Sequence, residues 1–293
     1  MTVDLQAAAS FLATHGRVVD RRRFEFLFGG GASRAVLAAV EGYRNADGGY
    51  GWGLEPDLRA PESQPGGALH ALEVFAEIGE SARAVEVFDW LAGVSLPDGG
   101  VPFAVPVRDP AGCAPFWVQA DPRVSSLQST AFVAEVAHRV AVRDSAVAAH
   151  PWLVTATRYC FDAIAALDGA PHAIALRFAV GLLDVVHDTH PEAGPLLDKL
   201  GAFIPADGLV AVAGGAEGET LRPLDFAPLP DRPVRGLFSE QVIADDLRRL
   251  ADEQDEDGGW RVDFDSYSPA AAVEWRGYKT VGTLSLLRAN GII

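Results

Sequence analysis

Apolar residues recur at intervals of three or four positions along most of the chain, which is the period of amphipathic α-helices. The stretch 64–78 shows this pattern clearly, with Leu69, Leu72, Phe75 and Ala76 at helical spacing and Gly79 as the residue that ends the helix. The same pattern predicts further helices over 4–14, 34–43, 82–91, 124–142, 152–167, 171–188, 192–203, 239–254 and 278–290.

Two stretches depart from the helical pattern. Phe24, Phe26 and Phe28 alternate with other residues, so a short strand or an extended segment is predicted there. The stretch 208–236 is rich in Gly and Pro and has no helical period. We expect either an inserted loop or irregular chain in place of an inner helix, as a long irregular insertion at about 207–237. Loops of this length are uncommon unless they are functional or mobile.

A short Asp-Gly motif separates the predicted helices. Asp47, Asp98, Asp168, Asp207 and Asp257 are each followed by glycine, and a second glycine follows in the first, second and last copies. Glycine supplies a positive φ at such a turn and Asp caps the turn, so the motif favours a structural role. Two helices in each interval of about fifty residues indicate a helical repeat.

The repeat predicts the fold class. A single helix pair cannot bury its own apolar face, so each pair must pack against its neighbours. We therefore expect an all-α protein, arranged as an (α/α) toroid of about five to six helix pairs. A single domain over 1–293 is expected, with the irregular insertion as its main interruption.

The charge and composition of the chain limit the classes of molecule that we expect it to bind. The net charge of −16 repels phosphate backbones and anionic membrane surfaces, which excludes nucleic acid as an expected partner. The sequence has no basic-then-apolar leader and no apolar run of transmembrane length. Its two cysteines, Cys113 and Cys160, do not make a disulfide framework. We expect a cytoplasmic protein, and its oligomeric state stays open.

The last copy of the motif also carries a family resemblance. Gln254-Asp255-Glu256-Asp257-Gly258-Gly259-Trp260 resembles the Gln-Trp repeat of the terpenoid cyclase and protein prenyltransferase superfamily. The stretch 45–52 is similar to a degenerate copy, with Asn in place of Gln. The resemblance implies an α/α toroid whose centre often holds an isoprenoid, and an activity such as cyclisation or prenyl transfer on a small apolar molecule.

The functional motifs of that superfamily do not carry over to this chain. Its alkene-protonating Asp-x-Asp-Asp motif is missing, and Asp245-Asp246-Leu247-Arg248-Arg249 fails the Asp-Asp-x-x-Asp pattern at the last position. No residue is therefore assigned as a metal ligand. The cofactor stays unknown, with Mg²⁺ as the ion that acidic loops could bind through oxygen ligands.

Carboxylates in the loops after the first and last turns are the candidate catalytic residues. Asp263 and Asp265 share one face of an extended segment. A carboxyl group in apolar surroundings has a raised pKa and can act as a general acid. The alternative is that these groups are solvated charges of an acidic chain. The candidates are Asp57, Asp263, Asp265 and Glu274.

Aromatic and charged residues near the same turns are the candidate substrate-binding residues. Loop aromatics can form an apolar pocket and stabilise a cation through their faces, and Arg suits a carboxylate or phosphate. Packing between repeats is the alternative role for the aromatics, and a satisfied core position is the alternative for His70. The candidates are Glu55, Tyr50, Trp52, Trp117, Trp260, Trp275, Arg276 and His70.

Three functions remain open from the sequence. The first is an enzyme that acts on an isoprenoid or similar apolar substrate, with loop carboxylates as acid or metal ligands. The second is a non-catalytic toroid that binds an apolar ligand or a partner protein, which the missing acid and metal motifs favour. The third is a carbohydrate-active α/α toroid, because paired carboxylates and aromatic loops also suit sugars.

Overall fold

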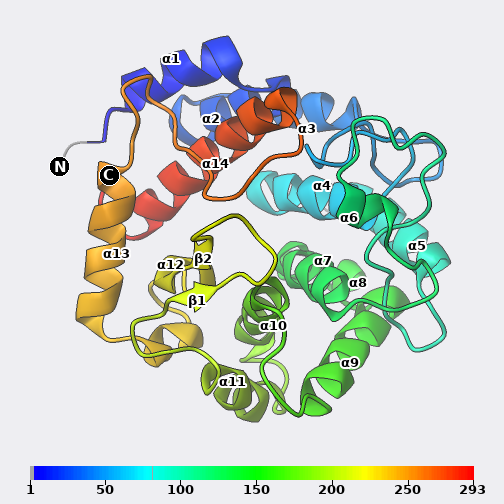
Figure 1. Cartoon of the computed structure of the whole chain (residues 1–293). Coiled ribbons are helices and arrows are strands. Elements are labelled where there is room, and N and C mark those ends of the chain that lie inside the picture. The colour runs from blue at the N-terminus through cyan, green and yellow to red at the C-terminus, as the bar shows by residue number, and fades with distance from the viewer. Residues whose placement is uncertain (1–2, 81) are drawn as a thin grey trace. The chain divides into compact units, whose positions relative to one another are not determined.

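The computed structural model describes residues 3–80 and 82–293, and these form fourteen α-helices, one 3₁₀-helix and one two-stranded sheet. The predominance of helix confirms the all-α fold class (Figure 1). The chain divides into two compact units: Met1–Ala39 with Ile204–Ile293, called unit 1 here, and Val40–Phe203, called unit 2. The single domain over 1–293 stays a prediction.

Unit 2 is built around α7, a fifteen-residue helix whose Ser126 cap accepts a hydrogen bond from Ser129 N. Buried apolar side chains cover most of α7, and the helix packs on α4, α9 and α10 (Figure 1). The helices of this unit are α4 (Pro65–Ile78), α5 (Ala82–Val94), α6 (Pro115–Val118), α7 (Leu127–Ala141), α8 (Ser145–Ala148), α9 (Pro151–Ala165), α10 (Ala173–Val186) and α11 (Ala193–Gly201). Helix α3 (Ser33–Glu41) leads the chain into it.

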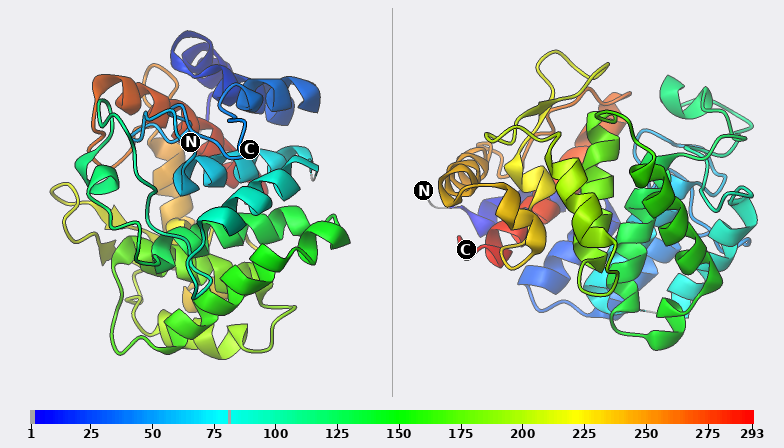
Figure 2. Two further views of the ribbon diagram at one scale, coloured as in Figure 1. Left: turned by 90° about the vertical axis from the view of Figure 1, so that its right-hand side faces the viewer. Right: turned by 90° about the horizontal axis from the view of Figure 1, so that it is seen from below.

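Unit 1 joins the first and last helices of the described chain. Helix α14 packs against α1, α2 and α13, and Figure 2 shows α1 and α2 side by side in dark blue. The two short strands pair antiparallel, with Val210 opposite Leu221. Its elements are α1 (Leu5–His15), α2 (Val18–Phe28), β1 (Val210–Ala211), β2 (Thr220–Leu221), α12 (Pro223–Phe226), η1 (Pro233–Leu237), α13 (Glu240–Asp252) and α14 (Pro269–Ala289).

Two local predictions are wrong. The alternating phenylalanines lie in helix α2, where Phe24 and Phe28 stack across one turn with ring centroids 5.3 Å apart. The salt bridge of Arg22 with Glu25 at i,i+3 spacing also favours the helix over a strand. The last helix begins at Pro269 rather than at residue 278, so Trp275 lies inside it and not in a loop.

None of the helices among the described residues combines the length and the apolar character that crossing a membrane requires.

The Asp-Gly-Gly turns share one geometry. The side-chain Oδ1 of Asp47, Asp98 and Asp257 accepts a hydrogen bond from the backbone N–H of the second glycine at 3.0, 3.1 and 3.0 Å. The first glycine has a φ of 90°, 92° and 92° in the three copies, a region that residues with a Cβ rarely adopt. The motif is therefore a structural turn in both units.

The first glycine of each turn also lies against the backbone of a neighbouring helix. A Cβ atom at Gly48 would lie 2.9 Å from the carbonyl oxygen of Glu86, and one at Gly99 would lie 3.1 Å from that of Thr155. At Gly258 the same atom would lie 2.3 Å from the carbonyl carbon of Ala7. These approaches need glycine for space as well as for φ.

The other two Asp-Gly pairs differ from each other. Gly208 has a φ of 72°, and Leu209 N donates to Asp207 Oδ1 at 3.1 Å, so this pair forms a related turn. The φ of Gly169 is not positive, so Asp168-Gly169 does not repeat the geometry.

Replacing Gly258 with Ala tests the turn. We expect Gly258→Ala to lower the free energy of unfolding by more than about 2 kcal/mol, because it adds both a strained φ and a clash with the backbone of α1. Gly282→Ala is the control, because a Cβ there meets nothing within 4 Å in helix α14. It should be neutral or stabilising by up to about 1 kcal/mol. Equal losses in urea unfolding would contradict the structural role.

Candidate functional site

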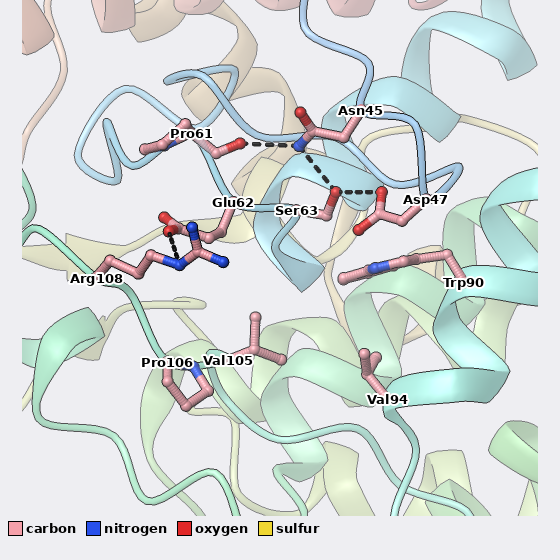
Figure 3. Close-up of a pocket in the computed structure, with 10 residues that line it drawn as sticks. All are labelled: Asn45, Asp47, Pro61, Glu62, Ser63, Trp90, Val94, Val105, Pro106 and Arg108. Atoms are coloured by element: carbon pink, nitrogen blue, oxygen red, sulfur yellow. Dashed lines mark hydrogen bonds and ion pairs between the residues drawn. The ribbon is translucent and has the colours of Figure 1, made fainter.

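Unit 2 contains a pocket with a volume of about 430 Å³. Small-molecule sites are commonly concavities of about 300–1,000 Å³ that combine apolar walls with a few polar groups. Figure 3 shows the side chains arranged around the hollow. They are Asn45, Asp47, Pro61, Glu62, Ser63, Trp90, Val94, Val105, Pro106 and Arg108.

Four segments of unit 2 supply these side chains. The first Asp-Gly-Gly turn contributes Asn45 and Asp47, and the loop before α4 contributes 61–63. Helix α5 contributes Trp90 and Val94. The long connection between α5 and α7 contributes Val105, Pro106 and Arg108.

The polar side of the pocket is held by a hydrogen-bond network. Ser63 Oγ donates to Asp47 Oδ1 at 2.7 Å, and Asn45 Nδ2 donates to Pro61 O at 2.8 Å and to Ser63 Oγ at 2.9 Å. Asn45 Oδ1 accepts from Trp52 Nε1 at 2.8 Å. These bonds fix the orientation of the carboxylate and the amide before any ligand arrives.

Glu62 and Arg108 form the charged end of the pocket in Figure 3. Glu62 Oε1 lies 3.7 Å from Arg108 Nε, which is a salt bridge but too long for a hydrogen bond. Glu62 Oε2 is buried and has no hydrogen-bond partner among the described residues. The Arg108 side chain is 94% exposed, so its attraction to Glu62 is largely screened by water.

The apolar side faces the network across the hollow, and Figure 3 shows Val94, Val105 and Pro106 there. Gln64 holds this wall in place. Its amide donates from Nε2 to Val105 O and accepts at Oε1 from Val105 N, both at 3.0 Å. Gln64 is 1% exposed and Val105 is half-buried, so this paired contact is partly shielded from competing water. The wall is thereby tied to the start of α4.

Part of the pocket belongs to the repeat itself. Ser125 Oγ donates to Asp98 Oδ1 at 2.6 Å, as Ser63 does to Asp47 in the first copy. The second glycine lies against a serine and an aromatic ring in both copies, and Tyr159 takes the place of Trp90 in the second. This Asp, Ser and aromatic set is therefore scaffold as well as pocket lining.

Other lining residues are specific to the first copy. Counted from the aspartate of each turn, Asn45 corresponds to Leu96. Counted from the serine, Glu62 corresponds to Val124. The fold accepts apolar residues at both positions in the second copy, so the amide and the carboxylate are not required to form the turn.

Two of the predicted residues of unit 2 meet in a buried ion pair. His70 Nε2 lies 3.0 Å from Glu55 Oε2, and its Nδ1 lies 2.8 Å from Glu73 Oε2. Burial alone would lower the pKa of His70, but the Glu73 and Glu55 carboxylates outweigh it and raise that pKa to about 9. The imidazolium ion therefore links the loop of residue 55 to helix α4 at neutral pH.

The remaining predicted residues of unit 2 lie near the loop of residue 55 and the first turn. Asp57 is buried, and its backbone N–H donates to Glu55 Oε1 at 3.1 Å. Trp117 stacks on Phe103 at 4.5 Å, and its buried Nε1 has no partner among the described residues. Tyr50 is buried and donates to Glu41 at 2.8 Å, and burial together with that carboxylate raises the pKa of Tyr50.

Trp52 is 56% exposed and has a φ of 57°, which is unusual for a residue with a side chain. Its only described role at the pocket is indirect, through the hydrogen bond to Asn45. The predicted residues of unit 2 therefore lie around the first turn and α4, but none of them lines the pocket. They are Tyr50, Trp52, Glu55, Asp57, His70 and Trp117.

Two of the predicted residues of unit 1, Arg276 and Trp260, make hydrogen bonds at or beside the last turn. Arg276 donates to both carboxylate oxygens of Asp257 at 2.8 and 2.9 Å and to Asp255 Oδ2 at 2.9 Å. Its guanidinium also lies 4.6 Å above the ring of Phe11. Trp260 is 1% exposed and donates from Nε1 to Leu250 O at 2.8 Å. Both side chains are engaged within the unit.

The predicted acidic residues of unit 1 differ in their exposure to solvent. Asp263 and Asp265 are exposed, and Glu274 is half-buried. Trp275 lies edge-on to Phe264 at 5.4 Å. Among the described residues, no group of three or more His, Cys, Asp or Glu side chains is placed to hold a metal ion, so a Mg²⁺ site at these loops stays a prediction.

Comparison with known proteins adds no assignment: no family model matches the chain, and no curated protein matches it.

Part of the pocket is recognisable from the sequence. The first turn was recognisable as a repeated motif, and the departure of Asn45 and Glu62 from the second copy is visible once the copies are aligned on their Asp and Ser residues. Arg108 and Val105 belong to no motif. Their place at the pocket depends on the Gln64 contact, which spans 41 positions of the chain.

The buried histidine predicts a pH-dependent stability. Since the pKa of His70 is raised on folding, its contribution is present below the unfolded value of about 6.5 and is lost as the pH rises through about 9. The destabilisation by His70→Gln should therefore fall by up to about 3 kcal/mol between pH 6.5 and pH 9.5. Urea unfolding of both proteins measures this. Glu73→Gln should move the loss to lower pH, and a pH-independent difference would contradict the ion pair.

The Gln64 contact predicts a local effect on the pocket wall. Gln64→Ala removes two hydrogen bonds to the half-buried backbone of Val105, which should cost about 1–3 kcal/mol of stability. Hydrogen exchange of the Val105 amide should become faster. Gln119→Ala is the control, because Gln119 is an exposed residue of the same connection. Equal exchange rates in the two variants would show that Gln64 does not hold the wall.

Proposed function

We propose that the pocket of unit 2 binds a small carbohydrate of about monosaccharide size. The observation that carries this proposal is the division of the lining into a polar side and an apolar side (Figure 3). A sugar ring has hydroxyl groups on its rim and C–H groups on its faces, so it matches such a divided pocket. Flexible polar metabolites without an apolar face match it less well.

The polar side supplies the groups that sugar hydroxyls need. Carboxylate oxygens of Asp47 and Glu62 accept hydrogen bonds, and the Arg108 guanidinium donates them. Asn45 is already bonded to Ser63, and Ser63 to Asp47, so the network is ordered without a ligand. Binding then loses little side-chain entropy on this side.

The apolar side supports the same ligand class. Val94, Val105 and Pro106 offer carbon atoms opposite the network, and the indole of Trp90 closes one end. Trp90 is 8% exposed, so it acts as a wall rather than as a broad stacking surface. This favours one sugar ring held edge-on over a long oligosaccharide lying along an aromatic platform.

An isoprenoid fits this pocket less well. An apolar chain would cover Asp47 and Glu62 without giving them hydrogen-bond donors, which is costly. A diphosphate group would meet two carboxylates and a single arginine. An isoprenoid-converting enzyme and a partner-binding protein therefore stay predictions that no feature of the pocket favours. We propose ligand binding and assign no reaction to the pocket.

The arrangement of the helix pairs as an α/α toroid also stays a proposal. The recurrence of one turn geometry at Asp47, Asp98 and Asp257 supports it, because a regular repeat is what such a ring requires. The expected cytoplasmic location belongs with these untested expectations.

Ligand-dependent thermal unfolding tests the carbohydrate proposal. A panel of monosaccharides, disaccharides and isoprenoid diphosphates with and without Mg²⁺ should give a shift only with the sugars. A ligand at a hundred times its Kd adds about 2.7 kcal/mol to the stability, which raises the midpoint by a few degrees.

Two valine variants test whether the sugar-dependent shift of the unfolding midpoint arises from this pocket. Val94→Phe places a larger side chain into the pocket and should abolish the sugar-dependent shift. Val142→Phe should retain it, because Val142 is 81% exposed and does not line the pocket. A shift with a diphosphate, or a sugar shift that survives Val94→Phe, would overturn the assignment of the sugar to this pocket.

A further inference from the structure

We infer that the pocket selects a cationic ligand, a sugar that carries an amine, and that Glu62 determines this selectivity. The inference rests on the proposed carbohydrate function and adds the chemical class of the ligand. It explains two features that a neutral sugar does not: the negative charge of the pocket and the missing hydrogen-bond partner of the Glu62 carboxylate.

The charges of the lining favour a cation. Asp47 and Glu62 are acidic and Arg108 is basic, so the ten lining residues carry a formal charge of −1. A neutral sugar leaves that charge uncompensated, whereas a single ammonium group neutralises it. The net charge of −16 on the whole chain adds a long-range attraction for cations.

The two carboxylates differ in what they still need. Asp47 Oδ1 already accepts from Gly49 N at 3.0 Å and from Ser63 Oγ at 2.7 Å, so the scaffold satisfies it in part. Glu62 Oε2 is buried without a partner among the described residues, and Oε1 has only the long contact with Arg108. Buried polar atoms are nearly always hydrogen-bonded, so Glu62 is the group that a donor would satisfy.

An ammonium group suits Glu62 better than a hydroxyl group does. A hydroxyl group that donates to the carboxylate already makes a charge-assisted hydrogen bond, but an ammonium group adds the attraction between opposite charges. Turning Glu62 towards a ligand breaks no hydrogen bond, because Oε2 has none to lose within the described chain. Arg108 competes weakly, since its exposed side chain can turn into solvent.

The second copy of the turn shows that the carboxylate is not needed for folding. Val124 stands at the position of Glu62 there, next to the serine that bonds the turn aspartate. The turn therefore forms without an acidic side chain at this position. Its position beside the pocket points to a role in binding.

Calorimetric titration with glucose and glucosamine tests the inference, because these probes differ only in one hydroxyl or ammonium group. We expect glucosamine to bind roughly tenfold more tightly than glucose at neutral pH and low salt. The difference should shrink as salt is added, since salt screens the charges of this open pocket.

Variants assign the preference to Glu62. Glu62→Gln should bind both sugars with similar affinity, and Arg108→Ala should increase the preference by removing the competing cation. Glu192→Gln is the matched control, because it removes the same charge from an exposed position of unit 2 outside the pocket and should keep the preference. A normal unfolding midpoint shows that each variant is folded.

The outcomes separate the two proposals. Binding of neither sugar overturns the carbohydrate function itself. Equal binding of both sugars to the unaltered protein keeps that function and overturns the cationic selectivity. A preference for glucosamine that survives in Glu62→Gln keeps the ligand class and overturns the role of Glu62.

Discussion

The hydrogen bond between an aspartate side chain and the second following glycine is the contact on which the rest of the structure depends. It closes the Asp-Gly-Gly turn, and the positive φ of the first glycine lets the turn lie directly on the backbone of a neighbouring helix. A residue with a side chain cannot make that approach without moving the helix. The distance between each turn and the helix that it lies on is thus set by glycine, whereas buried apolar side chains pack the helices against one another.

The pocket is a consequence of the same turn. Once Asp47 is fixed, Ser63 is bound to it and Asn45 is bound to Ser63, so polar groups gather beside the turn without a separate scaffold. Gln64, the next residue, then ties the opposite wall to the start of α4. The site is therefore built mainly from loops, and the hydrogen bonds of Asp47, Ser63, Asn45 and Gln64 hold these loops in place before a ligand binds.

How far the sequence could predict this structure depended on the range of the interactions. The helices and the turns at Asp47, Asp98 and Asp257 follow from local periodicity and from the properties of glycine, and these were predictable. The alternation of Phe24, Phe26 and Phe28 predicts a strand, but the segment is helical because side chains one helical turn apart, such as Phe24 and Phe28, pack on each other. The association of Glu55 with His70 and the place of Arg108 depend on contacts between distant positions, which a pattern in one sequence does not encode.

The presence of comparable turns has an evolutionary consequence. When a structural motif occurs more than once, the residues that make the turn are constrained in each copy, but the positions between them are free to diverge. Leu96 and Val124 in one copy, against Asn45 and Glu62 in the other, show such divergence at equivalent places. If the proposed ligand binding holds, a few substitutions at these positions would change the ligand preference while the repeated turns keep their stability.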